Sequence, residues 1–344
     1  MKPFLRHGVR SLTAVLFVAG LAIAFGGPRE PKPMSGMNDP FKDVEFADMP
    51  AVKYFASRDR SRLAFREYPA NHVPVSGTVV LIHGSAASSN SMHVMAKAFA
   101  QAGFWTYALD MRGHGNSGPK GHIDYIGELE NDVEDFINSV KHPGQTTLAG
   151  FSSGGGFVLR FAGGKRQTLF SNYLLLSPFL SEDAPTYRPN SGGWVRVGVP
   201  RAIALAVLNR FHITVFNDLP VVKFALEEAS RGFLTPQYSF ALEENFRPHR
   251  DYRADIRSAN QPLEVLVGQN DEAWRAESFA EVFNAEGKSV RVTIVPKIGH
   301  ITLTLNPVAV QAAISAVRRL DEGSDQPLHP TPGAALRASV SRSG

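Results

Sequence analysis

The 344-residue sequence contains no cysteine, and this absence excludes several kinds of site at once. Without thiols the chain has no disulfide, no thiolate metal ligand, no cysteine nucleophile and no cysteine to carry a lipid. Long blocks of one charge are also missing. The 36 basic and 32 acidic residues leave a formal net charge of only +4. The basic residues are scattered and are not interleaved with aromatic ones, so we do not expect a nucleic-acid partner.

Metal and cofactor motifs are equally scarce. The 11 histidines are mostly scattered and no H-E-x-x-H pattern occurs, so we expect no metal. A G-x-G-x-x-G match spans Gly113 to Gly118, but Pro119 and Gly121 interrupt the helix that a dinucleotide site needs directly after its glycines. We therefore expect no cofactor.

The N-terminal segment, residues 1–27, is more informative. Three basic residues lie within the first ten positions, and an apolar stretch follows over residues 12–25, ending near the small-residue pattern Ala22-Ile23-Ala24. These parts are typical of a secretory signal, and the stretch is short for a membrane span of roughly 20 residues. We expect an exported protein, periplasmic or secreted. The alternative is an uncleaved N-terminal anchor, through which the protein would associate with a membrane.

Strand and helix patterns alternate through two parts of the chain, residues 46–180 and 251–322. Apolar runs such as "TVVLIHG" (78–84) are typical of strands buried on both faces of a parallel sheet. Helical spacing of apolar residues follows at 90–103, 126–140 and 307–320, and residues 52–70 have the pattern of a hairpin. The alternation predicts an α/β fold with a mostly parallel central sheet flanked by helices. Residues 28–45 are expected to be a linker, and residues 323–344 a disordered tail.

Residues 181–250 interrupt this alternation. An insertion of that length is long for a loop and is usually functional, so we expect a helical cap or lid over the carboxyl ends of the strands. Its apolar residues favour either a pocket for an apolar acyl or alcohol group or the packing core of the cap itself. These residues are Trp194, Val195, Val197, Val199, Ile203, Leu205, Val207 and Leu208.

The stretch "LAGFSSGGGF" (148–157) contains the pattern G-x-S-x-G centred on Ser152. In a nucleophile elbow of this type, a strained turn between a strand and a helix exposes the middle serine, and the glycines leave room for the closely packed backbone. Here the pattern follows an apolar strand and opens a helix, which is the required context. A turn that merely needs small residues is the alternative interpretation.

A nucleophilic serine needs a base and a group to orient that base. Asp271 ends the strand in "VLVGQND", and His300 ends the next strand in "IVPKIGH". The carboxyl ends of neighbouring parallel strands meet at one edge of the sheet, so both side chains are expected beside Ser152. The chain order Ser, Asp, His is that of the α/β-hydrolase arrangement. Glu272 directly follows Asp271 and is an alternative acid.

An oxyanion hole is expected at the first loop of the sheet, where "LIHGSA" ends its strand at His83-Gly84-Ser85. A backbone N–H of this loop and the N–H of Ser153 would stabilise developing negative charge, each worth on the order of 3 kcal/mol.

The blocks "HGSA", "DMRGHGNSGPKG" (110–121), "GFSSGG", "GQND" and the final "GH" together resemble the α/β-hydrolase superfamily. The chain is similar to its monoacylglycerol lipase and lysophospholipase (serine aminopeptidase-like) group over roughly residues 52–320, with a poor match in the cap. The resemblance implies Ser152 as nucleophile, Asp271 as acid and His300 as base, with the amides of Ser85 and Ser153 as the oxyanion hole.

This resemblance implies a serine hydrolase acting on a small-molecule carboxylic ester, lipid-like and with an apolar acyl chain. Thioesters and amides, including aminopeptidase substrates, use the same residues and remain alternatives. A catalytically silent binding protein of the same fold is a further one, although such proteins usually lack a triad member and this sequence retains all three.

Overall fold

An eight-stranded sheet forms the centre of the protein, in a computed structural model that describes residues 17–34, 36, 39–189 and 193–324. The strand order is β1-β2-β4-β3-β5-β6-β10-β11. β2 pairs antiparallel with both β1 and β4, and all other pairs are parallel. The strands are β1 (Lys53–Ala56), β2 (Arg62–Tyr68), β3 (Gly77–Ile82), β4 (Phe104–Leu109), β5 (Thr146–Phe151), β6 (Asn172–Leu176), β10 (Leu263–Gly268) and β11 (Arg291–Val295). The mostly parallel sheet and the hairpin over residues 52–70 are confirmed.

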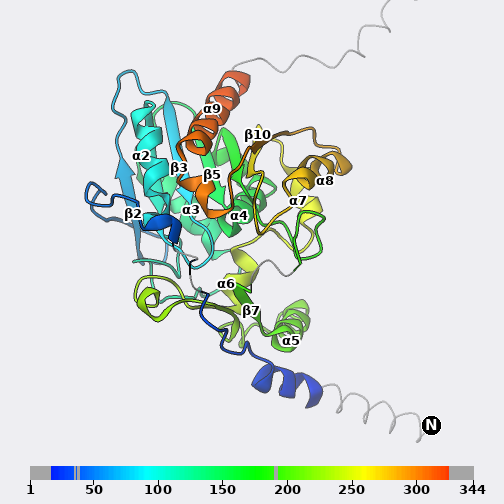
Figure 1. Cartoon of the computed structure of the whole chain (residues 1–344). Helices are drawn as coiled ribbons and strands as arrows, with labels where there is room; N and C mark the ends of the chain where they lie inside the picture. Colours follow the sequence, from blue (N-terminus) through cyan, green and yellow to red (C-terminus); the bar gives the residue numbers. More distant parts are fainter. Residues whose placement is uncertain (1–16, 35, 37–38, 190–192, 325–344) are drawn as a thin grey trace, which may run out of the picture.

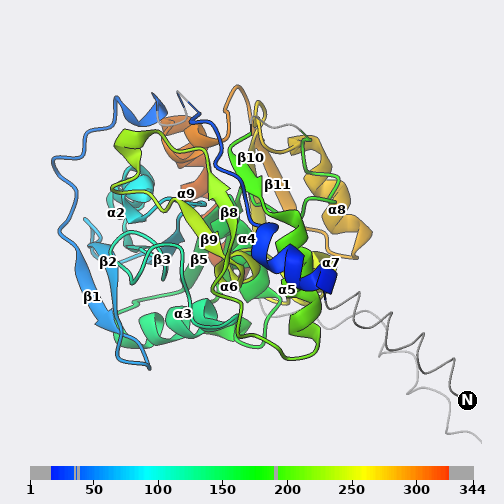
Figure 2. The same ribbon diagram turned by 90° about the horizontal axis from the view of Figure 1, so that it is seen from below.

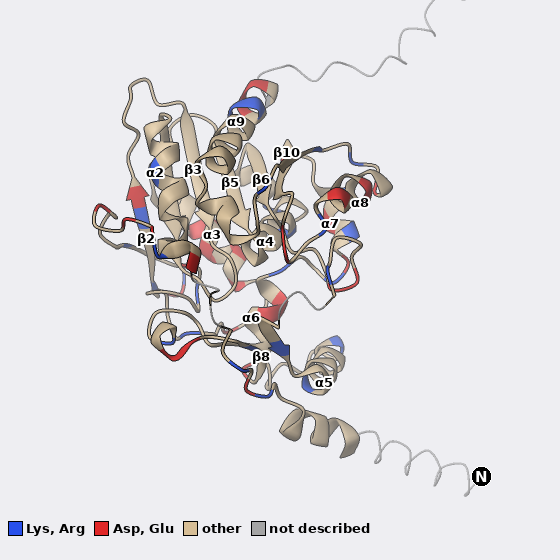
Figure 3. Cartoon of the chain, viewed as in Figure 1, with Lys and Arg blue, Asp and Glu red and all other residues tan. Residues whose placement is uncertain are grey.

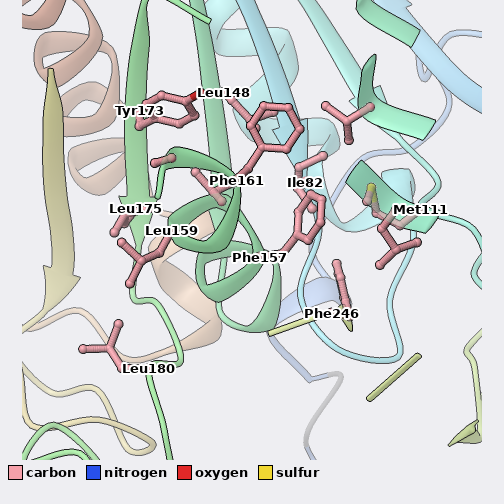
Figure 4. Packing of buried hydrophobic residues seen from close by; sticks show 14 of the residues in the cluster. Ile82, Met111, Leu148, Phe157, Leu159, Phe161, Tyr173, Leu175, Leu180 and Phe246 are labelled. Atoms are coloured by element: carbon pink, nitrogen blue, oxygen red, sulfur yellow. The ribbon is translucent and has the colours of Figure 1, made fainter. Parts of the chain in front are cut away.

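Helices cover both faces of this sheet, which explains why every residue of β3, β5, β6 and β10 is buried. α2 and α9 pack on one face, and α3, α4, α7 and α8 pack on the other. Figure 4 shows Phe157 and Phe161 of α4 packed against Ile82 and Leu148 of the strands. The helices are α2 (His93–Gln101), α3 (Glu128–Ser139), α4 (Ser153–Ala162), α7 (Tyr252–Ser258), α8 (Phe279–Ala285) and α9 (Pro307–Ser324).

The last helix illustrates how sequence signals place these elements. The Asn306 side chain accepts a hydrogen bond from the Val308 N–H at 2.9 Å, and Pro307 occupies the first turn, where its missing N–H costs nothing. Its buried face repeats at helical spacing through Val310, Ile314, Val317 and Leu320. α9 continues to Ser324, and the remainder of the expected tail lies outside the described residues.

Short 3-10 helices occupy several of the connections between these elements. They are η1 (Asp39–Phe41), η2 (Ser89–Met92), η3 (Gln167–Leu169), η4 (Glu228–Ser230), η5 (Ala276–Ser278) and η6 (Ile301–Thr304).

The insertion between β6 and α7 forms the expected cap, which lies below the sheet in Figure 1. It is built on a small antiparallel sheet as well as on helices, with the order β7-β8-β9. Val221, Val222 and Phe224 of its central strand are all buried, so this strand lacks the alternating pattern by which the sequence could have revealed it. The cap elements are β7 (Val195–Val197), α5 (Val199–Arg210), β8 (Pro220–Phe224), β9 (Gln237–Ser239) and α6 (Phe240–Asn245).

The N-terminal segment reaches the cap. Residues 17–25 are helical, and this helix lies beside α5 in both Figure 1 and Figure 2. Residues 1–16, which hold the first part of the expected signal, are outside the described ranges. Among the helices in the described part of the chain, none combines the length and the apolar character of a membrane span.

Candidate active site

Ser152 occupies the turn between β5 and α4 with φ 55° and ψ −119°, a conformation that only a strongly constrained residue adopts. The flanking positions must be glycine for steric reasons. A Cβ on Gly150 would lie 2.3 Å from the Gly154 carbonyl oxygen, and one on Gly154 would lie 2.2 Å from the His83 carbonyl oxygen. The turn therefore brings β5, the start of α4 and the end of β3 into direct backbone contact. This is the strained elbow that the motif predicts, with the serine at its tip.

The structure brings together the three residues expected to form a triad. The Ser152 Oγ lies 3.0 Å from His300 Nε2, and His300 Nδ1 lies 2.9 Å from Asp271 Oδ2. Asp271 follows β10 and His300 follows β11, so both side chains extend from neighbouring strand ends. With the Nδ1 proton donated to the carboxylate, Nε2 is left as an acceptor for the serine hydroxyl proton. This is the arrangement required of a general base beside a nucleophile.

The two adjacent carboxylates have different partners. Asp271 is buried, and one of its oxygens accepts hydrogen bonds from the N–H groups of Ala273 and Trp274, each at 2.9 Å. Burial opposes ionisation of Asp271, but the adjacent His300 and the hydrogen bonds from His300 and the Trp274 N–H outweigh it and hold its pKa below the ordinary value. Glu272 instead accepts the backbone N–H of His300 at 2.7 Å. Asp271 therefore contacts the imidazole ring, and Glu272 holds its backbone.

The loop after β3 and the start of α4 meet beside Ser152. Within the described residues, neither the Ser85 N–H nor the Ser153 N–H donates a hydrogen bond, so both remain available to an incoming oxygen. Ala86 in this loop has a positive φ of 62°, which is unfavourable for a residue with a Cβ. A strained residue of this kind persists only where its surroundings hold it.

The cap supplies the contacts that hold Ala86. Its N–H donates to the Tyr238 hydroxyl at 2.7 Å, and its carbonyl accepts the Thr235 N–H at 2.8 Å. The Tyr238 hydroxyl donates in turn to His114 Nε2 at 2.6 Å, because His114 Nδ1 faces the Arg112 carbonyl. Burial keeps the pKa of His114 well below its usual range and that of Tyr238 well above its own, so both are neutral. Sequence reasoning missed Tyr238 because no motif marks it.

Aromatic side chains surround the His300 imidazole. Trp274 packs edge-on against His300 with ring centroids 5.7 Å apart, and Phe151 lies at 4.7 Å. From the cap, the Trp194 Nε1–H donates to the Ser85 hydroxyl at 3.4 Å. Apolar walls of this kind reduce water access and strengthen electrostatic interactions at the site.

The loop after β4 is held by hydrogen bonds and an ion pair of its own. The Asp110 carboxylate accepts the N–H groups of Ser89 at 2.7 Å and Asn116 at 2.8 Å. The Arg112 guanidinium pairs with Asp132 at 2.7 Å. The glycines of this loop turn back on themselves through a His114–Ser117 bridge. Among the described residues, no group of three or more His, Asp or Glu side chains is placed to hold a metal ion.

Both interpretations of the apolar cap residues need correction. Leu205 is buried, and Trp194 and Leu208 pack against the main core, as a cap core requires. The remaining five line neither a core nor an enclosed pocket, because they are exposed on the outer surface of β7 and α5. These five are Val195, Val197, Val199, Ile203 and Val207. Their period along the helix is the same for an inward and an outward stripe, so spacing did not distinguish the two.

The sheet, the elbow and the order of the three residues define an α/β hydrolase. The family model of serine aminopeptidase, S33, matches residues 73–304, and the chain belongs to this family. A monoacylglycerol lipase of Mycolicibacterium smegmatis is 43% identical over 91 residues, which cover 25% of this chain and 32% of that protein. The chain thus matches about a third of the length of that relative.

Solved structures of two lipases share the fold. The monoglyceride lipase of Saccharomyces cerevisiae, studied as a soluble variant, superposes with a TM-score of 0.60 at 18% identity, covering 83% of this chain and 99% of the yeast one. The monoacylglycerol lipase of Paleococcus ferrophilus gives 0.56 at 20% identity, covering 76% and 98%. These structures confirm the fold class, while the family model and the Mycolicibacterium relative support the similarity to the monoacylglycerol lipase group.

Proposed function

We propose that this hydrolase cleaves carboxylic esters by nucleophilic attack of Ser152. The observation that carries the proposal is the unbroken chain of hydrogen bonds from Ser152 Oγ to His300 at 3.0 Å and from His300 to Asp271 at 2.9 Å. A silent binding protein has no use for a strained serine paired with an oriented imidazole.

In this reaction, Oγ attacks the ester carbonyl carbon while His300 Nε2 takes the hydroxyl proton. The carbonyl oxygen becomes an oxyanion and accepts hydrogen bonds from the N–H groups of Ser85 and Ser153. His300 then gives its proton to the departing alkoxide, which leaves an acyl ester on Ser152. Water attacks this ester in a second round of the same steps and releases the carboxylic acid.

For the substrate we propose a lipid-like ester of the monoacylglycerol or lysophospholipid type. The similarity to monoacylglycerol lipases supports it, as do the aromatic side chains around His300. Thioesters and amides would follow the same route and are separated by experiment.

The test compares the full chain with two single-serine variants on p-nitrophenyl esters from acetyl to palmitoyl, with a thioester and an aminoacyl anilide alongside. Ser152→Ala is expected to lower kcat by at least about 10⁴-fold, because the nucleophile is removed. Ser153→Ala keeps its backbone N–H and is expected to stay within about tenfold of the wild type, because the oxyanion hole uses that N–H and not the side chain. Labelling by a fluorophosphonate, followed by peptide mass analysis, should place the adduct on Ser152. Equal loss in both variants, or no adduct on a folded protein, contradicts the proposal.

A further inference from the structure

The helix of residues 17–25 is joined to the cap at its C-terminal end. The Arg201 side chain of α5 donates hydrogen bonds to the carbonyls of Ile23 at 2.8 Å and Ala24 at 3.1 Å, and its backbone N–H donates to the Gly26 carbonyl at 3.3 Å. A further donor of Arg201 reaches the Pro220 carbonyl of β8 at 2.9 Å. One guanidinium thus satisfies carbonyls that a helix end leaves unpaired and fastens them to the cap sheet.

Contacts with the cap continue beyond the helix. A Cβ on Gly26 would lie 2.8 Å from the Pro200 side chain, so the two backbones pack directly. Further along, Glu30 pairs with both Lys223 and Arg231 at 2.8 Å. Residues 17–34, part of which we expected to be a linker, therefore lie along the surface of the cap. Cleavage after Ala24, the position that a signal sequence predicts, would cut between the carbonyls that Arg201 binds.

This helix and α5 together expose an unusual amount of apolar surface. Along α5 and its end, every fourth residue from Val199 to Phe211 is apolar and exposed, while Ala204 and Leu205 face the interior. We call the exposed apolar residues of these segments the apolar face: Phe17, Val18, Leu21, Phe25, Val195, Val197, Val199, Ile203, Val207, Phe211, Ile213, Val215 and Phe216. Their exposed fractions range from 38% for Val195 to 83% for Phe25. Contiguous apolar surface on this scale marks an interaction site.

The two segments that form the apolar face contain charged residues of one sign, with Glu30 and Asp218 at their borders. The chain has 32 acidic residues, yet none occurs in residues 1–29 or 184–217, the two segments that form or adjoin this face. The same segments contain Lys2, Arg6, Arg10, Arg29, Arg188, Arg196, Arg201 and Arg210. In Figure 3 the helix of residues 17–25 is free of coloured charges, and α5 shows blue at its ends and no red. An apolar stripe edged by basic residues is complementary to an anionic lipid surface.

The same charges disfavour other occupants. A second copy of the chain would place basic residues against basic residues, and residues 1–16 also contain basic residues and no acidic one. We propose that the apolar face docks on a bilayer containing anionic lipid, and that the N-terminal helix is retained as part of this surface. Val195 of this face directly follows Trp194, whose side chain contacts Ser85, so docking would bring the membrane close to a cap residue that reaches the site. This last link rests on the proposed function, whereas the docking itself does not.

Vesicle flotation tests the docking without using catalysis. The full chain carrying Ser152→Ala is mixed with vesicles of phosphatidylcholine alone or of equal parts phosphatidylcholine and phosphatidylglycerol. We expect binding to the mixed vesicles to be at least tenfold tighter, because basic residues near the membrane attract anionic lipid. Adding Ile203→Asp and Val207→Asp should weaken it about 100-fold, because both exposed side chains lose their apolar contact with lipid. The matched control is Val308→Asp on α9, 65% exposed and outside this face, which should bind as before.

The outcomes separate the two proposals. No flotation, equal binding to both vesicle types, or undiminished binding of the double variant overturns the docking. Light scattering could instead detect dimers of the parent, but not of the double variant, without vesicle binding. That result would assign the apolar face to a second copy of the chain and also overturn the docking. Hydrolysis of p-nitrophenyl acetate by the same variants with Ser152 restored reports on the proposed function separately. Intact mass of the chain expressed in a bacterium should include residues 17–27, and a mature terminus after Ala24 would falsify retention.

Discussion

The edge of the sheet that carries Ser152, Asp271 and His300, here called the catalytic edge, and the cap that covers it hold the same site by different means. At the catalytic edge, the positions are set by backbone contact: Gly150 and Gly154 have no room for a side chain, and Ser152 is strained into its turn. From the cap, the buried Tyr238 hydroxyl holds the Ala86 N–H through a side-chain contact, beside a backbone bond from Thr235 to the Ala86 carbonyl. Backbone constraints restrict the residue type to glycine and so form a motif. Side-chain contacts leave no such pattern.

The two regions also differ in how firmly they are packed. β3 and β5 are buried along their whole length, whereas all three residues of β7 are exposed. The loop after β3, the proposed oxyanion loop, lies between them, with its strained Ala86 held by the cap. We propose that the core supplies the reacting groups and that the cap adjusts one part of the electrostatic environment. Three pairs of measurements examine this division.

The largest effect is expected within the catalytic edge, between the neighbouring carboxylates. Asp271→Asn should lower kcat by about 10³–10⁴-fold, because an amide neither fixes the imidazole tautomer nor stabilises its positive charge. Glu272→Gln should change kcat by less than about tenfold, since the amide oxygen still accepts the His300 N–H that Glu272 now binds at 2.7 Å. Steady-state kinetics on a short p-nitrophenyl ester gives both values. Similar losses in the two variants would mean that the acid role is shared.

A smaller effect is expected where the cap contacts the core. Tyr238→Phe removes the hydroxyl between Ala86 and His114 and leaves a buried N–H without its acceptor. The loop should shift and lower kcat by about 10–100-fold with KM nearly unchanged, a fraction of the effect of deleting an oxyanion donor. Affinity for a boronic acid, which mimics the tetrahedral intermediate, should fall in parallel with kcat.

The matched control for this variant is Tyr107→Phe. Tyr107 is also buried, and its hydroxyl donates to the Lys141 carbonyl at 2.7 Å, far along the chain from every triad residue. The Tyr107→Phe variant should lose roughly 1 kcal/mol of the free energy of unfolding in urea and keep its kcat within about threefold of the wild type. If Tyr238→Phe lost only stability in the same way, the hydroxyl would have no role in placing the oxyanion loop.

These differences explain how far the sequence predicted the molecule. The strands, α9 with its Asn306 cap, and the approach of Ser152, Asp271 and His300 all follow from local patterns and from the geometry of parallel strand ends. The distinct partners of Asp271 and Glu272 could not be predicted in this way, because the two residues are adjacent in one motif and only the loop conformation separates them. Tyr238 lay beyond prediction, since its contact with Ala86 joins segments far apart in the chain.

The N-terminal helix shows the same limit in a different form. Its apolar composition indicates burial in some apolar environment, and a signal, an anchor and a cap helix satisfy that equally. The Arg201 contacts to the carbonyls of Ile23 and Ala24 help to connect it to α5, and an arginine that binds carbonyls has no recognisable sequence context. Composition therefore indicates the kind of environment, while the partner depends on tertiary structure.

The smallest effect is expected at the outer junction of core and cap. His122 of the core loop lies 2.5 Å from Asp218 of the cap and 3.0 Å from Asp124. Burial lowers the pKa of His122, but its two carboxylate partners outweigh this and raise it above the ordinary value. A raised pKa means that the folded state binds the proton more tightly, so the stabilisation is complete below about pH 6.5 and is lost as the pH rises through the folded pKa.

The groups are largely exposed, so we expect no more than about 0.5 kcal/mol, reduced further by salt. Urea unfolding of the wild type and His122→Gln should differ at pH 5.5 and converge at pH 8.5. A difference that does not change with pH would show that His122 stabilises this junction by packing and not by its charge. Convergence would show that the His122 contact with the cap is weak and titratable, in contrast to the pH-independent backbone contacts that hold Ser152.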